Sequence, residues 1–254
     1  MASRVTALRA SPVKGFPQES VGSLELVAEG IVEDRRFVIF QPDDLKALYG
    51  AELRVLAGAR AEWDAGAGSL TLRFADGEAV TAVIDEGEEL TAYGYGPRPI
   101  PGRVVNGALA GALSERVGKH LKLLAVAPSV GAIKAATIVS EASVRRVADE
   151  LGVAGLDPRR FKMNIEIDGV EAHAEDQWDG RDVSIGEAVV RIAGPVPRCV
   201  LTTLDPDTLV RDADTLRAIL AYRRPMAGGE PPFGMYATVV QAGQITVGDL
   251  VEPV

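Results

Sequence analysis

The sequence predicts an α+β fold that is mainly β, with antiparallel sheets and a few helices. Three observations support this class. Short apolar runs recur at a spacing of about 8–12 residues, which is typical of β-barrels and β-sandwiches. Turn-forming Gly and Asp residues separate these runs, and strands do not alternate with helices as in a parallel α/β sheet. The 254 residues suffice for one large domain or two smaller ones.

Strands are expected wherever an apolar run lies between turn residues. In residues 164–169 the apolar side chains occupy every second position, which predicts one buried face and a turn at Gly169. Hairpins are expected at Asp76–Gly77, Gly186–Glu187 and Ala242–Gly243. The other expected strands are residues 35–40, 69–74, 79–84, 121–127, 182–185, 188–193, 235–240 and 244–251.

Helices are expected in fewer places. Ser140 can cap a helix whose apolar stripe follows helical spacing and which ends near Gly152; the stripe consists of Val144, Val147, Ala148 and Leu151. Residues 107–119 and 213–222 are weaker helical candidates. Residues 94–102 contain three Pro and three Gly, so we expect a loop there.

Composition excludes several classes of function. A balance of 27 basic and 36 acidic residues, a net charge of −9 and 5% aromatic residues do not fit a nucleic-acid-binding protein. One Cys excludes an internal disulfide, and this chain cannot hold a Cys-rich zinc site or an iron–sulfur cluster. Neither a leader peptide nor a membrane-spanning segment is recognisable, so we expect a cytoplasmic protein with no membrane partner.

Familiar catalytic motifs are missing from the sequence. Two acidic segments are expected to be turns. No phosphate-binding loop, dinucleotide fingerprint or nucleophile elbow occurs. Residues 205–208, Asp-Pro-Asp-Thr, are expected to form a turn and not a metal loop. Glu175 and Asp176 are expected to form a solvated acidic turn.

The segment Gly194-Pro-Val-Pro-Arg-Cys-Val200 contains the single Cys. Pro195 and Pro197 stiffen the backbone before Cys199 and favour extended geometry. The neighbouring Arg198 favours a thiolate, which is a soft ligand for a transition metal. The alternative is that Cys199 is a small buried hydrophobic side chain at the start of a strand.

Short segments along the chain, taken in order, resemble the MOSC family, and within it the amidoxime-reducing proteins and their bacterial relatives. The C-terminal half contributes residues 138–143, 160–165, 175–178, 197–203, 205–208, 233–236 and 247–249. The N-terminal half contributes residues 11–14 and 33–37, which resemble the β-barrel domain that accompanies such MOSC domains. The resemblance implies a β-barrel N-terminal domain in residues 1–125 and an antiparallel β-barrel MOSC domain in residues 126–254.

The resemblance also implies a function. The family binds a pterin-based molybdenum cofactor and reduces the N–O bond of N-hydroxylated substrates. The position that matches the family's molybdenum ligand is Cys199. Positions that match its cofactor contacts are Lys14, Gly15, Arg35, Lys162, Asn164 and Arg198. Since this chain cannot hold an iron–sulfur cluster, a separate protein would supply electrons, such as a ferredoxin or a cytochrome b5 with its flavin reductase.

Three positions depart from the family pattern. Lys162 stands where an Arg is usual, and Gly15 and Pro197 stand where Ser is common. Lys keeps the charge but loses the two-pronged hydrogen bonding of Arg. Two alternatives therefore stay open: a diverged MOSC protein that has lost the cofactor and performs other chemistry, and a carrier of the cofactor or of sulfur on Cys199.

Overall fold

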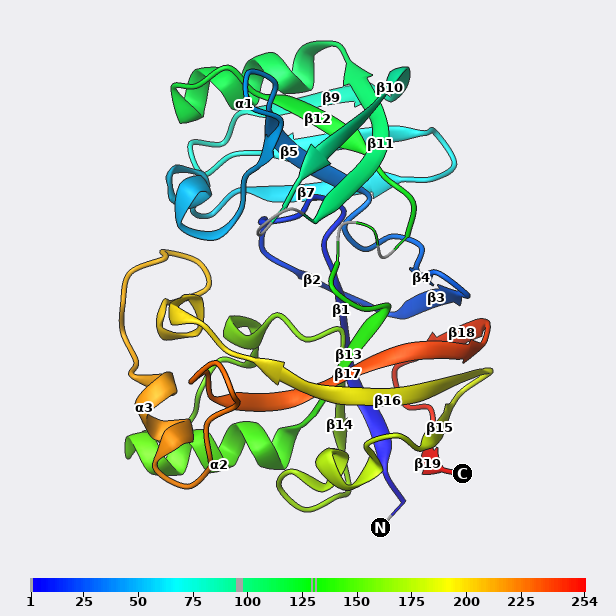
Figure 1. Ribbon diagram of the computed structural model, residues 1–254, viewed down its shortest axis with the longest axis vertical. Coiled ribbons are helices and arrows are strands. Elements are labelled where there is room, and N and C mark those ends of the chain that lie inside the picture. Colours follow the sequence, from blue (N-terminus) through cyan, green and yellow to red (C-terminus); the bar gives the residue numbers. More distant parts are fainter. Residues whose placement is uncertain (1, 95–97, 129, 131) are drawn as a thin grey trace. The chain divides into compact units, whose positions relative to one another are not determined.

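The computed structural model describes residues 2–94, 98–128, 130 and 132–254, and it confirms the α+β, mainly β class. The chain divides into two compact units (Figure 1). The sheet unit comprises Met1–Ala10, Ser20–Val32 and Lys134–Val254, and the barrel unit comprises Ser11–Glu19 and Glu33–Ile133. The first strand thus belongs to the same unit as the C-terminal half. The expected boundary between residues 125 and 126 stays a prediction.

The sheet unit is built on an eight-stranded sheet with the order β19-β15-β16-β17-β13-β14-β1-β2. Among the neighbours whose pairing is resolved, β13 and β14 run parallel and the others antiparallel. The strands are β1 (Arg4–Ala10), β2 (Glu19–Val21), β13 (Ala136–Ser140), β14 (Ile165–Asp168), β15 (Asp182–Ile185), β16 (Ala188–Pro197), β17 (Pro232–Gln241) and β19 (Val251–Pro253). A smaller sheet has the order β18-β3-β4, with β3 (Ser23–Val27), β4 (Gly30–Ile31) and β18 (Gly243–Thr246).

Strand β14 and its turn at Gly169 confirm the expectation for residues 164–169, but both faces of the strand are buried. Gly169 has φ +83°, and a Cβ there would lie 2.7 Å from the Ala2 carbonyl oxygen, so the turn favours glycine. Glu166 is buried, and Arg9 on the neighbouring strand β1 forms an ion pair with it at 2.5 Å. The prediction of a single buried face was therefore wrong.

The hairpin at Gly186–Glu187 is confirmed by the pairing of β15 with β16. Strand β16 continues through the stiff segment to Pro197, although Gly194 adopts φ +85° where the register with β17 shifts. The prediction of a hairpin at Ala242–Gly243 was wrong. Strand β17 pairs with β13 and β16, whereas β18 pairs with β3. Gly243 packs so closely that a Cβ there would lie 2.6 Å from the carbonyl carbon of Glu187.

The three expected helices are present, each close to its predicted range. In α2 (Glu141–Leu151) the Ser140 hydroxyl accepts a hydrogen bond from the Ser143 N–H, and Gly152 ends the helix in the left-handed region. Helix α2 packs against β13, β14 and α3 (Thr215–Leu220) in the sheet unit (Figure 1). The sheet unit also contains the short 3-10 helices η2 (Pro158–Phe161), η3 (Ala174–Trp178) and η4 (Val200–Thr203).

The barrel unit contains a closed barrel with the order β10-β11-β12-β5-β6 and a separate sheet with the order β7-β8-β9. The hairpin at Asp76–Gly77 is confirmed by the pairing of β8 with β9. Helix α1 (Ala108–Val117) and the 3-10 helix η1 (Gly50–Leu56) pack together, and α1 also contacts β9 and β12. The strands are β5 (Phe37–Gln41), β6 (Lys46–Ala47), β7 (Arg60–Asp64), β8 (Ser69–Arg73), β9 (Ala79–Val83), β10 (Asp85–Tyr93), β11 (Pro99–Asn106) and β12 (Lys122–Ala125).

Part of the expected loop at residues 94–102 is strand, because β11 begins at Pro99. Pro99 and Pro101 pair only with β10, whereas the pairing of β11 with β12 involves Arg103 and the two residues after it. Both prolines thus lie where the strand has a single partner, which tolerates a missing N–H. Residues 95–97 of the expected loop lie outside the described residues.

Candidate functional site

Cys199 lies at the junction between β16 and η4, and its side chain is exposed. This exposure contradicts the alternative of a small buried hydrophobic residue. Two hydrogen bonds fix its carbonyl oxygen, which accepts from the Thr202 N–H and from the Thr202 hydroxyl, both at 3.1 Å. The backbone at Cys199 is therefore held from one side by the stiff end of β16 and from the other by the first turn of η4.

The neighbouring Arg198 points into the sheet unit and is buried. Its guanidinium donates to the Phe161 carbonyl at 2.6 Å, to the Phe233 carbonyl at 2.5 and 2.8 Å, and to the Met163 sulfur at 2.7 Å. Burial lowers the pKa of Arg198 to about 10. Arg198 thus ties the end of β16 to the start of β17 and to the segment after η2.

A second buried arginine, Arg160, holds the backbone that follows Cys199. It donates to the carbonyls of Thr202 and Leu204, both at 3.1 Å, and forms an ion pair with Asp212. The Thr202 hydroxyl also contacts the Thr215 hydroxyl at 2.8 Å. One charged side chain therefore fixes the C-terminal end of η4. Sequence reasoning did not assign this role to Arg160, because its partners lie more than forty positions along the chain.

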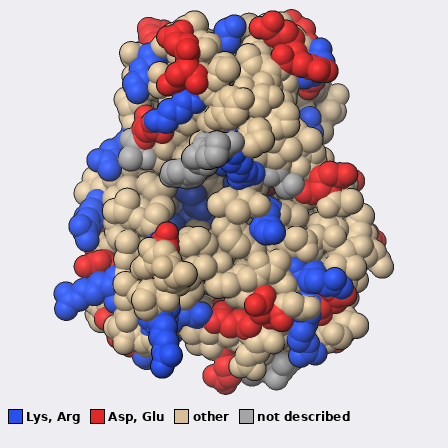
Figure 2. Space-filling model, viewed as in Figure 1, with Lys and Arg blue, Asp and Glu red and all other residues tan. Residues whose placement is uncertain are grey.

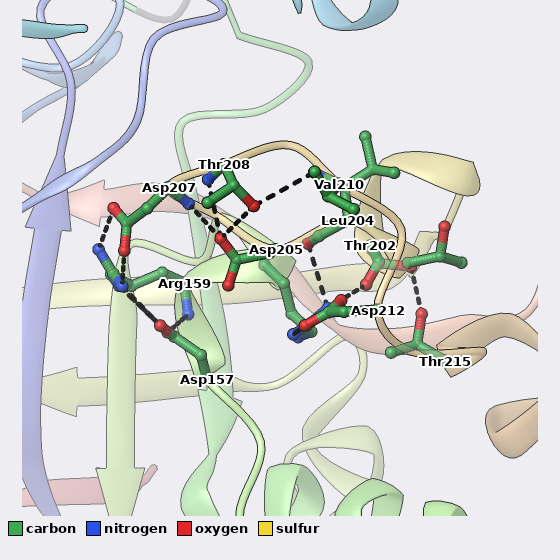
Figure 3. A network of polar contacts seen from close by, with 12 residues as sticks. Asp157, Arg159, Thr202, Leu204, Asp205, Asp207, Thr208, Val210, Asp212 and Thr215 are labelled. Atoms are coloured by element: carbon green, nitrogen blue, oxygen red, sulfur yellow. Dashed lines mark hydrogen bonds and ion pairs between the residues drawn. The ribbon is translucent and has the colours of Figure 1, made fainter. Parts of the chain in front are cut away.

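The expected turn at residues 205–208 is confirmed. The Asp205 carboxylate accepts hydrogen bonds from the N–H groups of Asp207 and Thr208 and from the Thr208 hydroxyl, and the bonds from Thr208 lower its pKa (Figure 3). Asp207 instead forms a two-pronged contact with Arg159, which Asp157 also binds. Among the described residues, no group of three or more His, Cys, Asp and Glu side chains is arranged to hold a metal ion.

Two further predicted site residues lie on either side of Met163. Lys162 is half-buried, with φ +49°, and ends η2. Asn164 is fully buried: its side-chain oxygen accepts from the Thr137 hydroxyl at 2.9 Å, and its amide donates to the Arg9 carbonyl at 3.1 Å. The structure thus brings residues 161–164 next to Arg198, but the amide of Asn164 faces into the sheet.

The other three predicted site residues lie together in the barrel unit, near the start of β5. The Lys14 N–H donates to the Phe37 carbonyl at 2.8 Å. Arg35 forms an ion pair with Asp34 at 2.5 Å. Gly15 has φ +98°, and a Cβ there would lie 2.7 Å from Leu53 Cδ1. The departure from Ser to Gly at this position therefore has a structural reason, since a side chain would be strained and crowded.

The charge around Lys14 reveals a residue that the sequence did not indicate. The pKa of Lys14 is lowered to about 7. Burial is the main cause, the positive charges of Arg35 and Arg98 lower the pKa as well, and the negative charge of Asp34 opposes them in part. Arg98 lies in the stretch that was expected to be a featureless loop. A single cation among Pro and Gly residues has no pattern that sequence reasoning could have recognised.

The prediction of a solvated acidic turn at Glu175 and Asp176 was wrong. Glu175 is fully buried and accepts hydrogen bonds from the Ser143 hydroxyl at 2.8 Å and from the Ser140 N–H at 3.2 Å. Burial raises its pKa. Asp176 forms an ion pair with Arg223. The local sequence resembles a surface turn, but the N-terminus of α2 supplies hydrogen-bond donors that allow the carboxyl group of Glu175 to be buried.

His173 lies next to this carboxyl group, and we expect it to make the protein sensitive to acid. Burial, then the charges of Arg223 and Arg146, lower its pKa from about 6.5 to about 4. An unfolded chain takes up this proton more readily, so the contribution to stability is present above pH 6.5 and is lost as the pH falls towards 4. At pH 5 the loss should be about 1 kcal/mol, after allowance for solvent screening of a ring that is partly exposed.

The measurement compares the free energy of unfolding at pH 7 and pH 5 in the unmodified protein and in His173→Asn, since Asn tolerates the left-handed backbone at this position. The variant should lose less stability on acidification. His120→Asn is the control because His120 is exposed. Equal acid sensitivity of all three proteins would show that His173 does not titrate in this way.

Charged side chains of both signs are spread over the face of the molecule drawn in Figure 2. On the face drawn in Figure 2, Lys and Arg side chains are interspersed with Asp and Glu side chains. On this face the cations form local groups and not one broad basic surface. Within the part of the chain that the structure describes, no helix is long and apolar enough to cross a membrane.

Comparison with known proteins identifies the C-terminal half. A family profile described as the MOSC domain matches residues 127–252. The rat mitochondrial amidoxime reducing component 2 is 39% identical over 96 residues, which are 35% of this chain and 28% of that protein. The human mitochondrial amidoxime-reducing component 1 is 36% identical over 119 residues, which are 44% of this chain and 34% of that protein. The match thus covers well under two thirds of either relative.

A solved structure supports the fold. The YuaD protein of Bacillus subtilis has a TM-score of 0.50 and covers 100% of this chain, with 96% of its own chain matched. Its sequence identity is 14%, so the likeness concerns the fold alone.

Proposed function

Since the chain belongs to the MOSC-domain family through residues 127–252, we propose that it is a molybdenum-cofactor-dependent reductase of N-hydroxylated substrates. The identity of 36–39% to amidoxime-reducing components carries this proposal. Reduction of an N-hydroxyl group takes two electrons and two protons and yields N–H and water. When bound, a molybdenum cofactor supplies the two-electron chemistry, and the protein supplies binding and orientation.

The residues of each unit fit the chemical needs of such a cofactor. A thiolate is a soft ligand that suits molybdenum, and Cys199 carries an exposed sulfur on a backbone held at both ends. A pterin phosphate needs cations and N–H donors, which Lys14 and Arg35 supply near the start of β5. We therefore assign Cys199 to the metal, and Lys14, Gly15 and Arg35 to the anionic part of the cofactor.

The remaining predicted cofactor contacts, Arg198, Asn164 and Lys162, have other roles than Lys14 and Arg35 under this proposal. Arg198 and Asn164 shape the site, because their polar groups bond to the protein's own backbone. Lys162 keeps a positive charge beside this framework and remains a proposed cofactor contact. Arg160 fixes η4 and so maintains the position of Cys199.

Electrons for the reaction are proposed to come from a separate protein. The chain has one Cys, which is too few for the ligands of an iron–sulfur cluster. A ferredoxin, or a cytochrome b5 with its flavin reductase, has a suitable one-electron centre. We propose that the reaction takes place in the reducing cytoplasm, where a free thiol persists.

The test is to express the protein in a host that makes the cofactor, and to measure molybdenum per chain and the reduction of benzamidoxime by a reduced viologen dye. We expect the unmodified protein to bind molybdenum and to turn over. Cys199→Ser should lower the turnover rate by more than about 100-fold, because the metal loses its protein ligand. Val200→Ala, which changes the exposed neighbour, is the matched control and should keep its activity.

Each outcome selects one function. A protein that contains no molybdenum contradicts both the reductase and a carrier of the cofactor, and leaves the diverged alternative. Molybdenum without turnover, together with transfer of the cofactor to another apoprotein, indicates the carrier. Equal activity of Cys199→Ser and Val200→Ala overturns the assignment of Cys199 to the metal.

A further inference from the structure

The carbonyl oxygen of Cys199 is held by both donors of a single residue, Thr202. The Thr202 N–H and the Thr202 hydroxyl each donate a hydrogen bond to it at 3.1 Å. Thr202 is buried, and its own carbonyl accepts a hydrogen bond from Arg160 at 3.1 Å. Every polar group of Thr202 therefore has a partner, and two of these groups restrain the residue that carries the thiol.

The hydroxyl of Thr202 also contacts the hydroxyl of Thr215, with 2.8 Å between the two oxygens (Figure 3). A hydroxyl carries one proton, and a carbonyl oxygen can only accept a hydrogen bond. Since the hydroxyl proton of Thr202 is used at the Cys199 carbonyl, the proton between the two threonines comes from Thr215. The hydrogen bonds thus run in one direction, from the Thr215 hydroxyl through the Thr202 hydroxyl to the carbonyl of Cys199.

Thr215 is the first residue of α3 and is fully buried. Among the described residues, its hydroxyl makes no hydrogen bond other than the one to Thr202. The packing of α3 fixes the position of this hydroxyl, because Ala218 and Ile219 are buried in the same apolar cluster as residues of α2. A β-branched side chain also has few rotamers. The donor at the start of this series of hydrogen bonds is therefore held firmly by the sheet unit.

We propose that Thr215 is a positioning residue for Cys199, which it orients through the hydroxyl of Thr202. A metal ligand has to be held within about 0.5 Å of its bonding geometry by neighbours whose own positions are fixed. The hydrogen bonds end at the carbonyl of Cys199, so they act on the direction of its side chain and not on the charge of its sulfur. The inference rests on the proposed function only for the metal that Cys199 would bind, since the orientation of the thiol can be measured without it.

The first test uses Cys199 itself, which is exposed and is the single Cys of the chain. A nitroxide label attached to this thiol in cofactor-free protein reports, through its electron paramagnetic resonance spectrum, how firmly the backbone beneath it is held. Thr215→Val keeps the shape of the side chain but cannot donate a hydrogen bond, so the label should become more mobile. Thr215→Ser keeps the hydroxyl and should retain most of the immobilisation.

The matched control for the label experiment is Thr203→Val. Thr203 is buried in the same 3-10 helix, η4, and its hydroxyl donates to the Val200 carbonyl at 2.7 Å. The substitution removes a hydrogen bond of the same kind but leaves both hydrogen bonds to the Cys199 carbonyl in place. The label should therefore keep the mobility that it has in the unmodified protein. Equal gains of mobility in Thr215→Val and Thr203→Val, or no gain in either, overturn the proposal.

The second test asks whether Thr215 acts through Thr202. Thr202→Val removes the hydroxyl donor to the Cys199 carbonyl and should raise the mobility of the label by itself. The double variant with Thr202→Val and Thr215→Val should then match Thr202→Val alone, because the last hydrogen bond of the series is already missing. A role of Thr215 that is only structural predicts that the two effects add, and additive effects would contradict the proposal.

The third test is made in a host that produces the cofactor. Loss of a partner that orients a metal ligand costs about 10- to 100-fold in metal affinity or activity, so Thr215→Val should contain several-fold less molybdenum per folded chain than Thr203→Val. Label mobility that depends on Thr215, in a chain that never contains molybdenum, supports the positioning role and contradicts the proposed function. Equal molybdenum content and equal label mobility in Thr215→Val and Thr203→Val contradict the positioning role and leave the proposed function standing.

Discussion

Arg198→Met is expected to lower the free energy of unfolding of the sheet unit by about 2–4 kcal/mol. The buried guanidinium satisfies the carbonyls of Phe161 and Phe233, and methionine fills similar space without a donor. Each buried carbonyl that loses its donor costs on the order of 1–3 kcal/mol, which the relief of a buried charge offsets in part. The effect is large because Arg198 joins three segments that are distant in sequence.

The measurement can be confined to one unit because the chain has two Trp residues, Trp63 in the barrel unit and Trp178 in the sheet unit. In a Trp63→Phe background, denaturant unfolding followed by fluorescence reports on the buried Trp178. Arg191→Met is the control, because Arg191 is exposed on the same strand and pairs with Asp182 at 2.7 Å. An exposed pair contributes about 1 kcal/mol or less. Equal losses in the two variants would show that the bonds of Arg198 do not stabilise the sheet unit.

The local elements of the fold were predictable because their signals lie within a few residues. The Ser140 cap and Gly152 determine where α2 begins and ends. The hairpin at Asp76–Gly77 follows from a turn between two apolar runs. The failures involve distant partners: β18 leaves β17 to pair with β3, which lies over two hundred positions earlier in the chain. No local pattern distinguishes such a partner from the neighbouring strand.

In the candidate site, too, local features were predictable and contacts between distant segments were not. Cys199 was recognised because a single thiol after Pro195 and Pro197 is a local feature, and the structure shows that it is exposed. Whether Arg198 points outward or inward depends on carbonyls more than thirty positions away, so its direction could not be read from the sequence.

Glu175 illustrates why charge alone misleads. Two consecutive acidic residues before a Trp have the composition of a surface turn. Burial of Glu175 is possible because Ser140 and Ser143, at the start of α2, donate hydrogen bonds to one of its oxygens. A carboxyl group near a helix N-terminus is also favoured by the helix dipole. The sequence contains the cap but does not show that this acid approaches it.

Asn164→Leu is expected to lower the free energy of unfolding of the sheet unit by about 2–4 kcal/mol, in protein that contains no cofactor. The buried amide accepts from the Thr137 hydroxyl and donates to the Arg9 carbonyl, so it links β13, β14 and β1. Leucine leaves both of these buried groups without that partner. If Asn164 acts only by contact with a cofactor, the same substitution leaves the stability of the cofactor-free protein unchanged.

The Trp63→Phe background serves again, with unfolding of the sheet unit reported by Trp178. Asn106→Leu is the matched control, since Asn106 is exposed and its amide bonds to Asp85 at 3.1 Å. We expect that control to stay within about 0.5 kcal/mol of the parent protein. A large loss in Asn164→Leu alone assigns the residue to the framework of the sheet. A cofactor-free Asn164→Leu as stable as Asn106→Leu, with reduced molybdenum content in a cofactor-producing host, would instead make Asn164 a cofactor contact.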